Sequence, residues 1–224
     1  MNQQTVADPA WPRVRDLRGD PLEGPLSLCW PAGHRVVISG LPGCGKSTLM
    51  RRAVGPDGRG DSVITVDSQD VRRRWDRRLA HRLPYAAYRP VVRLAHYARM
   101  AWALRRSAPV LVHDCGRVPW VRGWLAWHAR RRGRPYHLLL VDVPPDEALA
   151  GQARRGRAVS AYAFRRHRRA MARLVARVEA GRLPPGCGSV ILLDRPVAAR
   201  SLLRFAAEPD GSTAADDYPR VGRP

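Results

Sequence analysis

The segment from Gly40 to Thr48 constrains this 224-residue chain more than any other part of its sequence. It reads GLPGCGKST, which fits the pattern G-x-x-x-x-G-K-[ST], and it follows the short apolar run 35–39. Glycines in such a segment allow backbone N–H groups to turn towards phosphate oxygens. A helix is expected from about Lys46, so strand, loop and helix follow in the order that phosphate binding requires. The sequence therefore predicts a nucleoside-triphosphate site, with ATP as the expected ligand.

The motif lysine is also the only lysine of the chain: Lys46 stands against 39 arginines among 40 basic residues. Arginine is a wide planar fork, whereas lysine is a compact charge on a thin stem, and a loop wrapped around phosphates has room for the second. We expect Lys46 to reach the β- and γ-phosphates, Ser47 to hold Mg²⁺ and Thr48 to contact the α-phosphate. The other predicted loop contacts are Gly40, Pro42, Gly43, Cys44 and Gly45.

Composition leaves the partner open. A formal net charge of +21 fits a nucleic-acid partner, but the arginines are spread along the whole chain, which equally fits a solvated basic surface.

No apolar run approaches the roughly 20 residues that span a bilayer, and residues 1–9 lack the pattern of a secretion signal. We therefore expect a soluble cytoplasmic protein without a membrane partner. The four cysteines include no C-x-x-C pair, so neither a disulfide framework nor a zinc site is expected.

Apolar strand patterns alternate with helical patterns over the middle of the chain, which predicts an α/β fold of the P-loop NTPase type. The sheet should have five parallel strands sandwiched by helices, and its carboxyl-end edge should carry the ligand. The expected strands are 35–39, 62–67, 109–114, 137–143 and 189–194. The expected helices are 46–55, 70–82, 90–106, 118–132, 145–153, one capped by Ser160, and 196–207.

The same patterns divide the chain into an irregular N-terminal extension (1–30), one P-loop kinase-like domain (31–207) and a disordered tail (208–224). Within the extension, residues 26–30 are a candidate edge strand. Two sets of side chains are predicted to face the core. They are Trp120, Trp124 and Trp127 in one helix, and Val91, Leu94, Ala95, Ala98, Ala101 and Trp102 along one face of another.

Asp114 ends the third expected strand, where an aspartate holds magnesium through water in many P-loop proteins. The alternative is an aspartate that caps a turn. The next residue is Cys115, where many hydrolytic motor ATPases carry a glutamate that activates water. Its absence argues against a dedicated ATPase.

Two more carboxylates, Asp67 and Asp70, follow the second strand at the edge of the predicted phosphate site. Either could accept a proton from a substrate hydroxyl. The alternative is a helix cap, a role that suits Asp70.

Three arginines, Arg154, Arg155 and Arg157, lie on a short glycine-containing segment between two helices. As a lid, they would bring positive charge to a phosphoryl group in transfer. The alternative is one more arginine run in an arginine-rich chain.

Four segments, taken in order, resemble the zeta-toxin and polynucleotide-kinase-like group of P-loop kinases. They are GLPGCGKST, VDSQDVRRRW, VLVHDCGRVPWVR and HLLLVDVPPDEALAGQARRGRAVS. This group is the AAA_33 type of ATP-binding protein, common in actinobacteria, and the resemblance spans about residues 33–195. It implies that Asp70 lies near the substrate hydroxyl, that the three arginines form the lid, and that Arg122 helps bind substrate or phosphate. Gln69 departs from members that carry a second acid there.

The sequence thus predicts a kinase that uses Mg²⁺ and ATP to phosphorylate a hydroxyl of an unidentified acceptor. Two alternatives remain. One is an ATP-binding switch or weak ATPase without an acceptor, and the other is a kinase of nucleic-acid 5′ ends.

Overall fold

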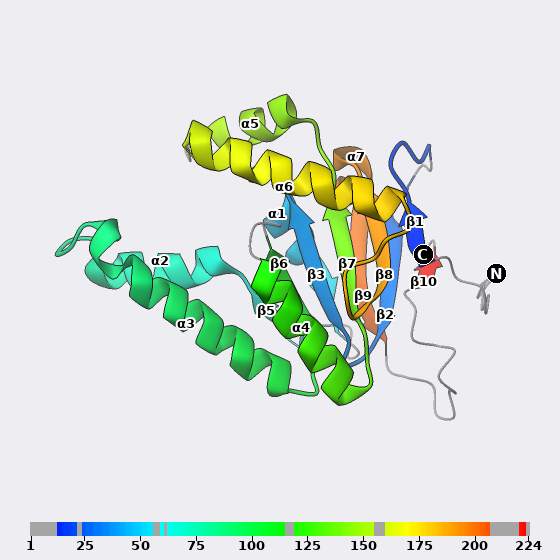
Figure 1. The fold of residues 1–224 in the computed structure, drawn as a ribbon, viewed down its shortest axis with the longest axis horizontal. Helices are drawn as coiled ribbons and strands as arrows, with labels where there is room; N and C mark the ends of the chain where they lie inside the picture. The colour runs from blue at the N-terminus through cyan, green and yellow to red at the C-terminus, as the bar shows by residue number, and fades with distance from the viewer. Residues whose placement is uncertain are drawn as a thin grey trace.

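The computed structural model describes residues 13–21, 24–55, 59–60, 62–114, 119–154, 160–206 and 220–222. Its main sheet contains six strands in the order β1-β8-β7-β3-β6-β5, and every neighbouring pair is parallel (Figure 1). The strands are β1 (Val14–Asp16), β3 (Arg35–Gly40), β5 (Ile64–Val66), β6 (Val110–Asp114), β7 (Tyr136–Val141) and β8 (Cys187–Leu193).

Strands β3, β7 and β8 are buried at every residue, as continuous apolar runs in a sheet covered on both faces should be. A second sheet of four strands has the order β10-β2-β9-β4. Its strands are β2 (Leu26–Pro31), β4 (Ala53–Val54), β9 (Ser201–Ala206) and β10 (Arg220–Gly222).

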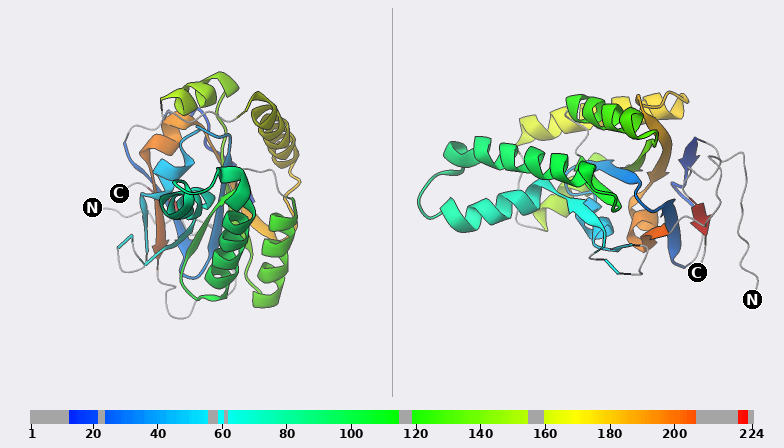
Figure 2. Two further views of the ribbon diagram at one scale, coloured as in Figure 1. Left: turned by 90° about the vertical axis from the view of Figure 1, so that its left-hand side faces the viewer. Right: turned by 90° about the horizontal axis from the view of Figure 1, so that it is seen from below.

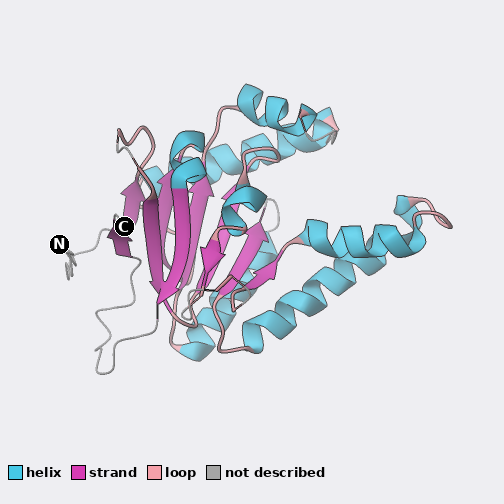
Figure 3. Cartoon of the chain, turned by 180° about the vertical axis from the view of Figure 1, so that it is seen from behind, coloured by secondary structure: helices cyan, strands magenta, loops and turns pink. Residues whose placement is uncertain are grey.

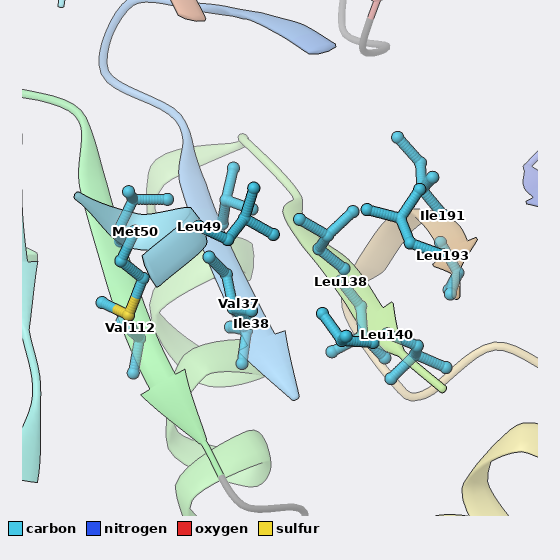
Figure 4. Close-up of a cluster of buried hydrophobic side chains, with 14 of the residues drawn as sticks. Val37, Ile38, Leu49, Met50, Val112, Leu138, Leu140, Ile191 and Leu193 are labelled. Carbon is cyan, nitrogen blue, oxygen red and sulfur yellow. The ribbon is translucent and has the colours of Figure 1, made fainter. Parts of the chain in front are cut away.

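The helices are α1 (Lys46–Met50), α2 (Ser68–Leu79), α3 (Tyr85–Arg105), α4 (Pro119–Arg132), α5 (Pro145–Ala153), α6 (Ala161–Glu179) and α7 (Arg195–Arg200). Helices α4 and α6 cover one face of the main sheet, while α1, α7 and the second sheet lie on the other face (Figures 2 and 3). Leu49 and Met50 of α1 pack beside Val37 and Val112 in the main core (Figure 4). None of the described helices is long and apolar enough to cross a membrane.

The predicted α/β class is confirmed, and a strand is found at each of the five predicted places. The prediction that the N-terminal extension is irregular is wrong for its described residues. Val14–Asp16 adds a sixth strand to the main sheet, with Val14 opposite Val190. Leu26–Pro31 is a strand as well, but it lies inside the second sheet between β9 and β10. Short strands of this kind are stabilised by pairing partners that are distant in sequence.

The C-terminal part also differs from its prediction. The last helix ends at Arg200, and Ser201–Ala206 forms β9, which pairs in parallel with β2. Burial alternates from Leu202 to Phe205, a period of two that a strand produces and a helix does not. Arg220–Gly222, in the predicted tail, pairs antiparallel with β2. The helix after the phosphate loop is also shorter than predicted and ends at Met50.

Helix α3 begins at Tyr85 and contains Pro90, which was predicted to be its start. Its predicted buried face is wrong: Val91, Leu94 and Trp102 are 42%, 71% and 47% exposed. The buried side chains are instead Tyr88, Val92, Met100, Ala103 and Leu104. Because α3 is apolar on both faces, periodicity alone does not tell which face turns to the core.

The tryptophans of α4 divide in a similar way. Trp124 packs against the core, but Trp127 is 44% exposed, with the guanidinium of Arg131 4.9 Å from its ring centre. The side chain of Trp120 lies outside the described residues. Ser160 does cap α6, as predicted, by accepting a hydrogen bond from the amide of Ala163.

Candidate nucleotide site

The predicted phosphate loop lies at the carboxyl end of β3, between β7 and β6 in the sheet. Its turn depends on Gly43 and Gly45, with φ angles of 93° and 107° that other residues rarely adopt. Within the described residues, the amides of Gly43, Gly45, Lys46 and Ser47 donate to no protein acceptor. The loop therefore offers several N–H donors to an anion.

The loop is packed too closely for a side chain at Gly40. A Cβ on Gly40 would lie 2.6 Å from the carbonyl oxygen of Val141 and 2.7 Å from Sγ of Cys44, which is itself buried. Thr48, beside the loop, accepts a hydrogen bond from Arg51 at 3.4 Å.

Lys46 is 4% exposed, and its Nζ donates to the carbonyls of Gly40 and Leu41, each at 2.7 Å. Sγ of Cys44 is 3.5 Å from the same Nζ. These partners are all neutral, and no ion pair involves Lys46 in the part of the chain that the structure describes. The lysine charge therefore remains available to phosphate oxygens.

Asp114 lies on the strand next to the loop strand, in register with Ser39. Its Oδ2 accepts a hydrogen bond from Oγ of Ser39 at 3.3 Å and lies 3.6 Å from Nη1 of Arg122. The sheet thus brings Asp114 and Arg122, two predicted site residues from different elements, to the base of the phosphate loop.

Asp67 directly follows β5, which lies on the other side of β6 from β3. It is the N-cap of α2. Its Oδ1 accepts the amide of Gln69 at 2.9 Å, and its Oδ2 lies 3.4 Å from Oγ of Ser47. The predicted alternative, a cap at Asp70, is therefore wrong, because the helix begins two residues earlier, at Ser68. Asp67 is buried beside the hydroxyl that was predicted to hold magnesium.

Sequence reasoning missed two histidines beside this carboxylate. Nδ1 of His113 lies 3.3 Å from Oδ1 of Asp67, and burial together with the charge of Lys46 lowers the pKa of His113 to about 4. His113 is therefore neutral at pH 7, so it does not form a charged pair with Asp67. Burial also lowers the pKa of His96 on α3, and its Nδ1 is buried without a hydrogen-bond partner among the described residues. The sequence signal for His113 is its place directly before Asp114.

The oxygen atoms of Ser47, Asp67 and Asp114 suit a magnesium ion, which prefers hard oxygen ligands. No three His, Cys, Asp or Glu side chains gather into a metal site in the described part of the chain. Magnesium is commonly held by one or two carboxylates together with waters and the phosphates of a substrate. The residues present therefore fit the predicted cation.

The remaining predicted residues lie further out. Asp70 is half-buried in the first turn of α2 and forms an ion pair with Arg73. Arg154 is exposed at the C-terminal end of α5. Arg155 and Arg157, like Cys115, lie outside the described residues.

Comparison with protein families adds a decisive observation: the AAA_33 model, described as an AAA domain, matches residues 36–180, which is more than half of the chain. The chain belongs to the AAA_33 family. The matched region begins in β3, directly before the phosphate loop, and ends just after α6. It therefore includes the phosphate loop, both buried aspartates and the arginine segment.

Solved structures give a weaker likeness. Shikimate kinase from Bacteroides thetaiotaomicron has 13% sequence identity and a TM-score of 0.32, over 82% of this chain and 92% of that chain. The protein TT1252 from Thermus thermophilus has 20% identity and a TM-score of 0.27, over 84% of this chain and 92% of that chain. No curated protein gives a significant match.

Proposed function

We propose that this AAA_33 protein is a magnesium-dependent kinase that transfers the γ-phosphate of ATP to a hydroxyl group of an acceptor. The observation that carries the proposal is the meeting of Lys46, Ser47, Asp67 and Asp114 at one edge of the sheet. Free loop amides and a lysine charge bind phosphates, while hydroxyl and carboxylate oxygens bind magnesium. The kinase-like nucleotide-binding fold provides the arrangement.

In this proposal the two buried aspartates and Ser47 hold the magnesium ion. The metal, when bound, neutralises the charge of the β- and γ-phosphates. Asp67 has limited freedom to act as a base, because the amide of Gln69 donates to its Oδ1 and Nδ1 of His113 lies 3.3 Å from the same oxygen. Its other oxygen is directed towards Ser47.

Asp70 is therefore the better base. It lies one helical turn beyond Asp67, and its side chain is 47% exposed, so an acceptor from solvent can reach it. As the acceptor oxygen forms its bond to the γ-phosphorus, the bond from that phosphorus to the leaving ADP oxygen breaks. The acceptor proton passes to the Asp70 carboxylate. Arg154, Arg155 and Arg157 remain the predicted source of positive charge for the phosphoryl group in transfer.

The test begins with a search for an acceptor among hydroxyl compounds, including sugars, nucleosides and 5′-hydroxyl oligonucleotides, with labelled ATP. Once an acceptor is found, Asp70→Asn should lower single-turnover transfer by on the order of 10²- to 10⁴-fold with ATP affinity nearly unchanged. Asp67→Asn should instead raise the magnesium concentration needed for half-maximal transfer. Wild-type transfer by both variants would disprove the assignment, and hydrolysis without any acceptor would favour a weak ATPase.

A further inference from the structure

Helix α5 contacts the outer side of the phosphate loop, away from the predicted phosphates. Nε2 of Gln152 donates to the carbonyl oxygen of Pro42 at 3.1 Å. In a trans peptide the carbonyl and the following N–H point in opposite directions. The carbonyl of Pro42 points to α5, so the amide of Gly43 points away from α5. That amide is one of those without a protein acceptor in the described residues.

Around Gly43 and Gly151 the contact between α5 and the loop leaves no space for a further side chain. A Cβ on Gly151 would lie 2.4 Å from the carbonyl oxygen of Gly43. A Cβ on Gly43 would lie 2.1 Å from the carbonyl oxygen of Ala148. Ala148, Gly151 and Gln152 are spaced by three and four residues, so they share one face of α5, and all three are buried.

Arg195, the first residue of α7, joins the same contact from the other side. Its Nη2 donates to the carbonyl of Glu147 at 2.9 Å and lies 3.4 Å from the carbonyl oxygen of Gly43. Its Nε donates to the carboxylate of Glu147 at 3.0 Å. Together with the two bonds from Lys46, every carbonyl from Gly40 to Gly43 thus has a side-chain donor.

We infer that Gly151, Gln152 and Arg195 form a positioning element. This element holds the loop carbonyls pointing outward, so that the loop amides face the phosphates. A loop that is already in its binding conformation loses less entropy when the ligand binds. The element therefore sets triphosphate affinity without touching the ligand. This inference rests on the nucleotide-binding part of the proposed function and is independent of the acceptor and of phosphoryl transfer.

The test measures the affinity of the full chain for Mg·ATP and for inorganic tripolyphosphate by calorimetry. Tripolyphosphate reports on the phosphate loop alone, because it has no base or sugar. Gln152→Met keeps the length of the side chain but removes the donor, and Gly151→Ala pushes α5 away from Gly43. Each should weaken both ligands by about two- to tenfold, the effect of losing one hydrogen bond.

A matched control is Gly123→Ala, also a helical glycine, with no atom within 4 Å of an added Cβ. It should leave both affinities unchanged. Melting temperatures measured beside the affinities separate loss of fold from loss of positioning, since a purely structural contact would lower only the melting temperature. Wild-type affinity in folded Gln152→Met and Gly151→Ala overturns the inference. A wild type that binds neither ligand overturns it together with nucleotide binding, whereas binding without transfer contradicts only the kinase proposal.

Discussion

At the residue scale, Lys46 shows how the choice of side chain follows from the space around it. Its Nζ lies among two carbonyl oxygens and a sulfur atom, and the residue is almost fully buried. A guanidinium is wider than an ammonium and does not fit between these atoms without displacing the loop. The 39 arginines elsewhere in the chain indicate that the lysine is retained at this position for its shape.

We expect Lys46→Ala to weaken Mg·ATP binding by about 10- to 100-fold, the effect of losing a charge-assisted hydrogen bond to phosphate. Lys46→Arg should be nearly as poor, because the charge is kept but the geometry is lost. Calorimetric titration with Mg·ATP measures both affinities. Equal affinity in the wild type and Lys46→Ala would show that the triphosphate binds elsewhere.

At the element scale, α3 carries apolar residues on two faces, and only one of them contacts the core. Met100 is fully buried in the main core, whereas Leu94, six residues earlier in the same helix, is 71% exposed. Met100→Ala should lower the free energy of unfolding by about 2–5 kcal/mol, because it leaves a cavity. Leu94→Ala should change it by about 0.5 kcal/mol or less. Urea unfolding of both variants tests which face the helix buries, and the reverse order would contradict the assigned face.

At the scale of the whole molecule, a buried histidine pair lies between the start of β3 and strand β7, at the end of the sheet opposite the phosphate loop. Nδ1 of His34 lies 2.8 Å from Nε2 of His137, whose Nδ1 is 2.9 Å from Oγ of Ser189. Burial, followed by the charges of Arg134 and Arg35, lowers the pKa of His34 to about 4. Burial also lowers the pKa of His137 well below its usual value.

Both histidines are therefore neutral in the folded chain, while the unfolded chain binds protons below its pKa of about 6.5. Stability should be fully present above pH 6.5 and should fall as the pH drops from about 6.5 to 4, by about 1.4 kcal/mol per pH unit for His34, with a further fall in the same direction from His137. Urea unfolding across this range measures the slope. His34→Asn should reduce it, whereas the exposed His81→Asn should not. An unchanged slope in His34→Asn would rule out this pair as the source.

The sequence by itself determined the phosphate loop, its lysine and a strand at each of the five predicted places in the sheet. These features depend on neighbouring residues: a glycine pattern, a short apolar run, a polar residue at a strand end. It also placed Asp67 and Asp114 at the same edge, because parallel strands end together. The proposed division of roles between Asp67 and Asp70 rests on the structure, since it depends on where α2 begins and on the distance to Ser47.

The tertiary structure alone decided the features that depend on distant partners. Strands β1, β9 and β10 are stabilised by β8 and β2, whose partner residues lie far away in the chain. The orientation of α3 depends on which of its two apolar faces meets the sheet. Gln152 contacts Pro42 across 110 positions of sequence. No local pattern marks such pairs, because burial and contact are properties of the assembled layers.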